Sequence, residues 1–204
     1  MLSEFQAFLE VGFRHIVALG AADHILFLLA LAAIYRGRDW RAALWVISAF
    51  TVGHSVTLAL AVTRLLSIPA PITEFLIPVT IVLTGLENLV LRERASSGPR
   101  AHHRPVFAGV FGLVHGAGFA GYLRSLFVDR IAVPLLGFNI GIELGQMVVL
   151  LAAAAAFWAV DRGLRVLPRP AAPAWRDPFR LRLVGVSALV TVVAAGWAWA
   201  RVPR

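Results

Sequence analysis

Long uninterrupted apolar stretches restrict the fold of this 204-residue chain more than any other feature of its sequence. Each is near the roughly 20 residues that a helix needs to cross the hydrocarbon core of a bilayer. Only 15% of the residues are charged, against about 25% in an average soluble domain. The blocks are also too long for the alternating strands of a membrane barrel. We therefore expect an all-α polytopic membrane protein, a single transmembrane domain over residues 1–204 with about six spans. The spans cover approximately residues 12–35, 42–66, 72–91, 105–127, 132–159 and 183–200.

The positive charges indicate how such helices would be oriented. All 19 basic residues other than histidine are arginines, and the net charge is +8. Most of them fall in three breaks between apolar blocks, residues 36–41, 92–104 and 160–182. The positive-inside rule makes these breaks cytoplasmic loops and places the N- and C-termini both outside. The arginines are thus explained by topology beside an anionic leaflet, and we expect no nucleic-acid partner. Residues 3–14, at the margin of the first span, could instead lie along the interface as an amphipathic stretch.

Ionisable side chains lie deep in four of these apolar blocks. His24 lies about 18 Å from the end of its span, His115 about 15 Å and Glu143 about 17 Å, at 1.5 Å per helical residue. His54 has a similar depth, and Asp23 precedes His24 directly. In a core about 30 Å thick, all of these groups fall in one layer near the midplane. Unpaired charged groups are costly there, so such a layer favours a metal or proton pathway.

Polar side chains and small residues recur at regular spacing around this layer. Asn139, Glu143 and Gln146 have i, i+4, i+7 spacing and form one stripe on a helix. Thr51 and Ser55 flank His54 on another span. Small residues at helix-packing spacing predict close contacts between helices. They are Gly112 and Gly116 in one span, and Gly137, Gly141 and Gly145 in the next.

Imidazole and carboxylate ligands suit divalent transition metals, and Asp23 could be a ligand or a partner that orients His24. The alternative is that the polar layer only joins the helices through hydrogen bonds. Glu87 and Asn88, near the inner boundary, could be stations on a pathway or simply solvated interfacial groups. The chain has no cysteine, which excludes a thiolate metal site.

Four segments together resemble the HupE/UreJ family of bacterial membrane proteins, and Glu87-Asn88 adds to the resemblance. They are residues 15–27 (HIVALGAADHILF), 50–58 (FTVGHSVTL), 111–119 (FGLVHGAGF) and 137–146 (GFNIGIELGQ). The similarity runs in order over about residues 11–150.

The resemblance implies a multi-pass protein of the bacterial inner membrane and a secondary permease for a divalent transition metal. Nickel is the metal favoured as substrate, with zinc or cobalt as alternatives. The implied metal-site residues are His15, Asp23, His24, His54, His115 and Glu143. In hydrogenase-linked members five residues typically separate the first histidine from the Asp-His pair, whereas here seven separate His15 from Asp23. Either the helix is broken near Gly20, or His15 lies outside the site.

Two other functions use the same residues. Three histidines around a zinc ion with an open position would activate water in an intramembrane hydrolase, with Asp23 or Glu143 as the base. Alternatively, the chain is a membrane assembly subunit without chemistry of its own. The expected partners are the lipid bilayer and the metal ion, with a homo-oligomer as a further option.

Overall fold

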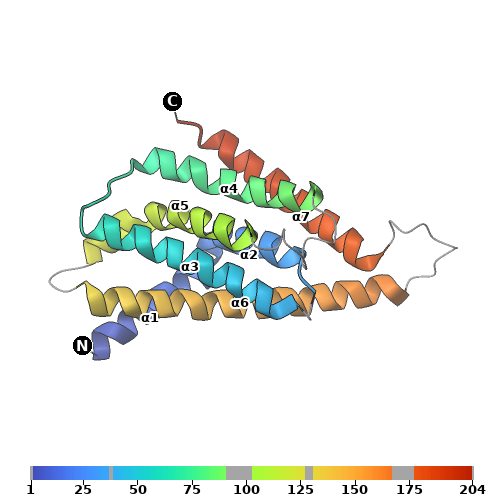
Figure 1. Ribbon diagram of the computed structural model, residues 1–204, viewed down its shortest axis with the longest axis horizontal. Coiled ribbons are helices and arrows are strands. Elements are labelled where there is room, and N and C mark those ends of the chain that lie inside the picture. The colour runs from blue at the N-terminus through green and yellow to red at the C-terminus, as the bar shows by residue number, and fades with distance from the viewer. Residues whose placement is uncertain (1, 37–38, 91–102, 127–130, 167–176, 204) are drawn as a thin grey trace.

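The computed structural model describes residues 2–36, 39–90, 103–126, 131–166 and 177–203, and this part of the chain is all-helical (Figure 1). Residues 92–102 and 167–176, which belong to the expected cytoplasmic loops, lie outside the described residues, as does His102. The elements are α1 (Leu2–Val17), the 3-10 helix η1 (Leu19–Ala21), α2 (Ala22–Ala33), α3 (Trp40–Val62), α4 (Ala70–Val90), α5 (His103–Leu126), α6 (Ala132–Val166) and α7 (Pro178–Ala200).

The helices lie side by side along one long direction of the molecule (Figure 1). Among the described residues, α3 to α7 each contain a stretch long and apolar enough to cross a membrane, and α1 and α2 pass the same test together as a bent pair, which gives up to six spans. Both chain termini lie at the same end, together with the connection between α3 and α4. The connection between α2 and α3 lies at the opposite end. This arrangement is the one that an even number of spans requires.

The expected span 12–35 is two helices rather than one. Ala18 has an extended backbone, with φ −69° and ψ 142°, so α1 stops there and η1 links it to α2. The two helices differ in direction by 67°. A break near Gly20, one of the two possibilities that the sequence left open, is therefore present. Residues 3–14 belong to α1, which packs lengthwise against α6 instead of lying apart from the bundle (Figure 1).

Glycines set the closest helix contacts, as their spacing predicted. A Cβ at Gly112 of α5 would collide with the Phe50 carbonyl of α3, and a Cβ at Gly141 of α6 would collide with the Leu9 carbonyl of α1. Gly137 faces the Phe5 carbonyl in the same way, four residues earlier on both helices. Because both numbers rise together, α1 and α6 run parallel. Two tightly joined pairs, α1 with α6 and α3 with α5, thus form much of the bundle.

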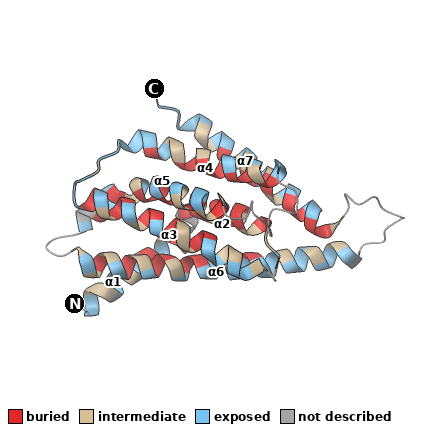
Figure 2. Ribbon diagram, in the orientation of Figure 1, coloured by how far each residue is buried: buried red, intermediate tan, exposed pale blue. Residues whose placement is uncertain are grey.

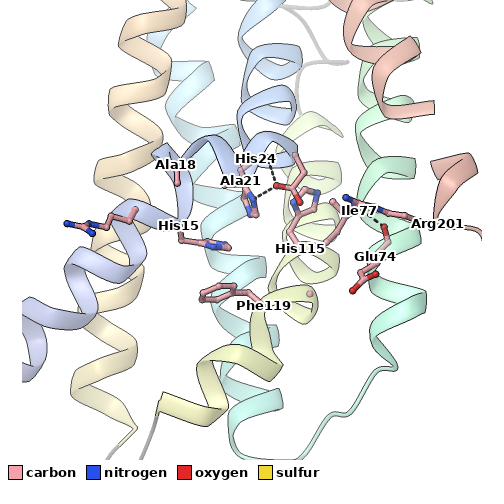
Figure 3. Close-up of a pocket in the computed structure, with 13 residues that line it drawn as sticks. His15, Ala18, Ala21, His24, Glu74, Ile77, His115, Phe119 and Arg201 are labelled. Atoms are coloured by element: carbon pink, nitrogen blue, oxygen red, sulfur yellow. Dashed lines mark hydrogen bonds and ion pairs between the residues drawn. The ribbon is translucent and has the colours of Figure 1, made fainter. Parts of the chain in front are cut away.

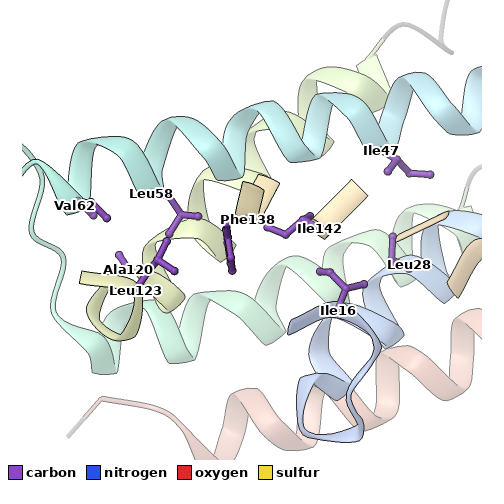
Figure 4. Packing of buried hydrophobic residues seen from close by; sticks show 10 residues of the cluster. Ile16, Leu28, Ile47, Leu58, Val62, Ala120, Leu123, Phe138 and Ile142 are labelled. Carbon is purple, nitrogen blue, oxygen red and sulfur yellow. The ribbon is translucent and has the colours of Figure 1, made fainter. Parts of the chain in front are cut away.

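Buried side chains fill the interior, while large apolar residues cover the outside (Figure 2). Trp45 is 73% exposed and Leu151 is 71% exposed, which suits contact with lipid. Figure 4 shows one buried cluster, in which Leu58, Phe138 and Ile142 meet between α3 and α6. The multi-pass membrane architecture is thus borne out by helix length, apolarity and the outward apolar surface.

Candidate metal site

The break in the first span brings two histidines together. His15 lies near the end of α1 and His24 in the first turn of α2, and their ring centroids are 4.6 Å apart. On an unbroken helix, nine residues would rotate these side chains by about 900°, to opposite faces. The 3-10 turn between the helices removes that constraint. The seven residues between His15 and Asp23 are therefore compatible with a site that His15 and His24 share.

Two further histidines reach the same place from other helices. His54 of α3 lies 6.1 Å from His15 and 6.3 Å from His24, measured between ring centroids. His115 of α5 lies 5.2 Å from His24. Four imidazoles from α1, α2, α3 and α5 thus converge. The common depth in the sequence predicted this for His24, His54 and His115, whereas His15 was implied only by the family resemblance.

Three of these residues have a spacing close to that of metal ligands. One ring nitrogen each of His15, His24 and His54 lies within 4.8 Å of the other two. Imidazole nitrogens bind zinc-like ions at about 2.0–2.1 Å, so three ligands spread around one ion lie about 3.4–3.6 Å from one another. A contraction of somewhat more than about 1 Å in the largest separation would therefore bring these nitrogens onto a single ion.

Unsatisfied nitrogens mark the same cluster. Within the described part of the chain, the buried atoms without a hydrogen-bond partner include Nε2 of His15, Nε2 of His24, both ring nitrogens of His54 and Nδ1 of His115. His54 has no exposed surface at all. A buried polar group that lacks a partner costs about 1–3 kcal/mol. Such a group in a native structure calls for an explanation. A bound cation is an explanation that accounts for the unpartnered nitrogens of all four histidines together.

Two hydrogen bonds orient the imidazoles. The Asp23 carboxylate lies 2.9 Å from Nδ1 of His24, and the same oxygen accepts the backbone N–H of His24. Because a carboxylate accepts, Nδ1 of His24 carries the proton and Nε2 keeps its lone pair. Nε2 of His115 lies 3.0 Å from the hydroxyl of Thr80 on α4. Sequence reasoning missed Thr80, although Thr73, Thr80 and Thr84 share one buried face of α4 at i, i+7, i+11 spacing and could have signalled a polar stripe.

A cavity of about 540 Å³ adjoins the histidines (Figure 3). His15, Asp23, His24 and His115 line it, whereas His54 does not belong to its wall. Glu74, at the beginning of α4, and Arg201, just beyond α7, line it as well, and Arg201 donates to the Glu74 carbonyl at 3.5 Å. Because α4 begins and α7 ends on the side of the molecule that holds the two termini (Figure 1), the cavity extends from the imidazoles toward that side.

Aromatic rings pack against three of the histidines. Phe119, which also lines the cavity, lies 3.9 Å from the ring of His15, Phe50 lies 5.1 Å from His115, and Phe138 stacks near His54 at 6.4 Å. Next to such apolar groups, interactions with a cation are stronger than in water.

The polar stripe of α6 faces α3. Ser48 donates to Glu143 at 3.3 Å, and Thr51 donates to the side-chain oxygen of Gln146 at 2.9 Å. Glu143 therefore has a partner of its own and is absent from the group of closely spaced histidine nitrogens. Ser55 donates to the Thr51 carbonyl at 2.6 Å, and the side-chain oxygen of Asn139 is buried without a partner among the described residues.

Glu87 and Asn88 join helices at the opposite end from the cavity. Glu87 pairs with His103 at 2.6 Å and with Arg104 at 3.1 Å. Asn88 donates to the Ala30 carbonyl and accepts from Arg104, both at 2.6 Å. We call these residues of α4 and α5 the α4–α5 clamp. Because Ala30 belongs to α2, the clamp holds three helices together on the side of the histidines away from the cavity.

Comparison with known proteins gives a family for the whole chain. A family model described as HupE / UreJ protein matches residues 1–201. A queuine tRNA-ribosyltransferase from Streptococcus pyogenes serotype M6 is 45% identical over 47 residues, which is 23% of this chain and 12% of that enzyme. So short a match leaves most of that enzyme without a counterpart here, and no solved structure matches. The family match, in contrast, spans every described helix, and the chain belongs to the HupE/UreJ family.

Proposed function

We propose that this protein is a secondary transporter for a divalent transition-metal ion in the bacterial inner membrane. One observation carries the proposal: four imidazoles with unpartnered buried nitrogens converge beside a cavity, at a helix break within the bundle. Broken helices are a recurrent way of building ion sites in transporters, since they free polar groups at mid-membrane depth. Membership of the HupE/UreJ family is consistent with metal transport.

The donor set suits nickel or a similar ion. Neutral imidazole is a good ligand for Ni, Co, Zn and Cu(II), while harder ions such as Mg²⁺ and Ca²⁺ prefer oxygen ligands. We propose His15, His24, His54 and His115 as ligands of the transported ion. Asp23 supplies a negative charge that orients His24 and offsets part of the charge of the cation.

Transport also needs a driving force and a way out. An inside-negative potential of about 100 mV favours inward movement of a cation by about 2.3 kcal/mol per charge. The ion reaches the imidazoles through the cavity, and leaving toward the opposite end requires the α4–α5 clamp to open. We propose that this conformational change delivers the ion to the cytoplasm.

Metal uptake into proteoliposomes tests the proposal. Vesicles with a trapped fluorescent metal indicator receive Ni²⁺ outside, and we expect saturable uptake that His54→Ala and His115→Ala each reduce at least about tenfold. Gly163→Ala is the matched control, because no atom lies within 4 Å of a Cβ placed there. Uptake that both histidine variants leave unchanged would reject the proposal.

The same preparation separates the competing functions. An intramembrane zinc hydrolase would retain its metal without exchange and would turn over a lipid or peptide substrate. An assembly subunit would bind none of Ni, Co, Zn or Cu after incubation. Either result would replace transport as the function.

A further inference from the structure

The hydroxyl of Thr80 lies beside two polar atoms, a backbone carbonyl oxygen and an imidazole nitrogen, and the carbonyl determines how it bonds to the imidazole. Its Oγ1 lies 2.7 Å from the carbonyl oxygen of Ile77 in the preceding turn of α4. A carbonyl oxygen can only accept, so the single hydroxyl hydrogen of Thr80 is donated to Ile77. The same Oγ1 lies 3.0 Å from Nε2 of His115, where it has only lone pairs left to offer. With the hydroxyl hydrogen directed to Ile77, the contact with His115 is a hydrogen bond only when Nε2 carries a hydrogen and donates it to Thr80.

We propose that Thr80 is a positioning residue, which holds His115 in the tautomer protonated at Nε2 and so makes Nδ1 its metal-binding atom. Nδ1 is buried and has no partner among the described residues, and His115 is 1% exposed. His115 forms part of the cavity wall beside Asp23 and His24. The assignment of Nδ1 as a ligand rests on the proposed transport function, whereas the tautomer itself does not.

Asp23 has the opposite effect on the neighbouring imidazole. It accepts from Nδ1 of His24, which leaves Nε2 as the atom with the lone pair. The adjacent rings of His24 and His115 are thus held in opposite tautomers, each with its unpartnered nitrogen free for a cation. Thr80, which is not a proposed ligand, thus fixes the tautomer of His115 as Asp23 fixes that of His24.

The position of Thr80 is itself well fixed. The side chain is 5% exposed, and its β-branched carbon restricts the first side-chain torsion. Valine has nearly the same shape but no acceptor, so Thr80→Val removes the hydrogen bond with little change of volume. Serine keeps the hydroxyl, so Thr80→Ser is the conservative variant. Thr84→Val is the matched control, since the Thr84 hydroxyl donates to the Thr80 carbonyl and not to a histidine.

Nitrogen NMR of the metal-free protein tests the tautomer directly. In protein labelled with ¹⁵N-histidine, protonated and unprotonated ring nitrogens give separate signals, and the loss of signals in His115→Phe assigns this residue. We expect a proton on Nε2 in the wild type, in Thr80→Ser and in Thr84→Val, and a mixture of tautomers in Thr80→Val. A proton on Nδ1 in the wild type, or unchanged signals in Thr80→Val, would overturn the inference.

Nickel binding to the purified protein tests the consequence. We expect Thr80→Val to weaken Ni²⁺ binding by about 10–100-fold, as loss of an orienting partner typically does, and Thr80→Ser to restore it. Equal affinities of the wild type and Thr80→Val would overturn the assignment of Nδ1 as a ligand. If the wild type binds no metal, the proposed function fails, and the NMR result alone decides the role of Thr80.

Discussion

Replacing His54 with leucine should stabilise the metal-free protein and at the same time remove most of the stabilisation that metal provides. His54 is fully buried, and neither ring nitrogen has a hydrogen-bond partner among the described residues. Each such atom costs about 1–3 kcal/mol in a soluble protein, and polar interactions within membranes tend toward smaller values. Leucine has a similar volume and no polar atom. We therefore expect His54→Leu to raise the free energy of unfolding without metal by about 1–2 kcal/mol.

Bound metal should make the wild type more stable than His54→Leu, the reverse of the order without metal. A ligand at 1,000 times its dissociation constant stabilises the native state by about 4.1 kcal/mol. If loss of His54 weakens binding about 100-fold, the same concentration adds only about 1.4 kcal/mol to the variant. Together with its gain of about 1–2 kcal/mol, the variant then remains less stable than the metal-loaded wild type by about 1 kcal/mol.

Denaturant unfolding of the detergent-solubilised protein, with and without Ni²⁺, measures both effects. His103→Leu is the matched control, because its ring is paired with Glu87 at 2.6 Å and lies in the α4–α5 clamp. We expect that variant to lose about 0–1 kcal/mol whether or not metal is present. A loss of stability in metal-free His54→Leu would refute the reasoning, since it would show that the nitrogens of His54 serve the fold.

Three further predictions concern packing, the clamp and pH. Gly141→Ala should destabilise the protein by about 1–3 kcal/mol, because the added Cβ collides with an α1 carbonyl. Gly163→Ala on the same helix, where a Cβ meets nothing within 4 Å, should be neutral or slightly stabilising in the same unfolding assay. Asn88→Leu should lower the free energy of unfolding by about 2–3 kcal/mol, because the Ala30 carbonyl and one Arg104 nitrogen each lose their bond to Asn88. An unchanged unfolding midpoint would argue against the clamp. Acidification should weaken Ni²⁺ binding in titrations, because protons and metal compete for imidazole lone pairs, and a pH-independent affinity would contradict histidine ligation.

Much of the fold could be predicted from the sequence, because bilayer thickness and helix rise relate length directly to structure. The apolar blocks correspond to the described helices, and the shared depth of His24, His54 and His115 reflects a real meeting of side chains. The glycine spacing predicted close packing because only a missing Cβ allows backbones to approach so closely.

Other features depend on rotation about helix axes and on local breaks, which depth alone does not determine. Glu143 has the right depth, but α6 turns its glycines toward α1 and leaves Glu143 bonded to Ser48 of α3. The spacing of His15 and Asp23 indicated a possible break near Gly20, but it left open whether the helix breaks or His15 lies outside the site. Thr80 acts through one hydrogen bond to a residue on the next helix, 35 positions along the chain, and the spacing within one helix does not specify such a partner.

X-ray absorption spectroscopy of the nickel-loaded protein tests the central claim most directly. It reports the atoms around the ion without requiring transport. We predict at least three imidazole nitrogens, in keeping with the closely spaced nitrogens of His15, His24 and His54, and one fewer imidazole in His54→Leu. A shell of oxygen ligands alone, or a spectrum that His54→Leu leaves unchanged, would contradict the account.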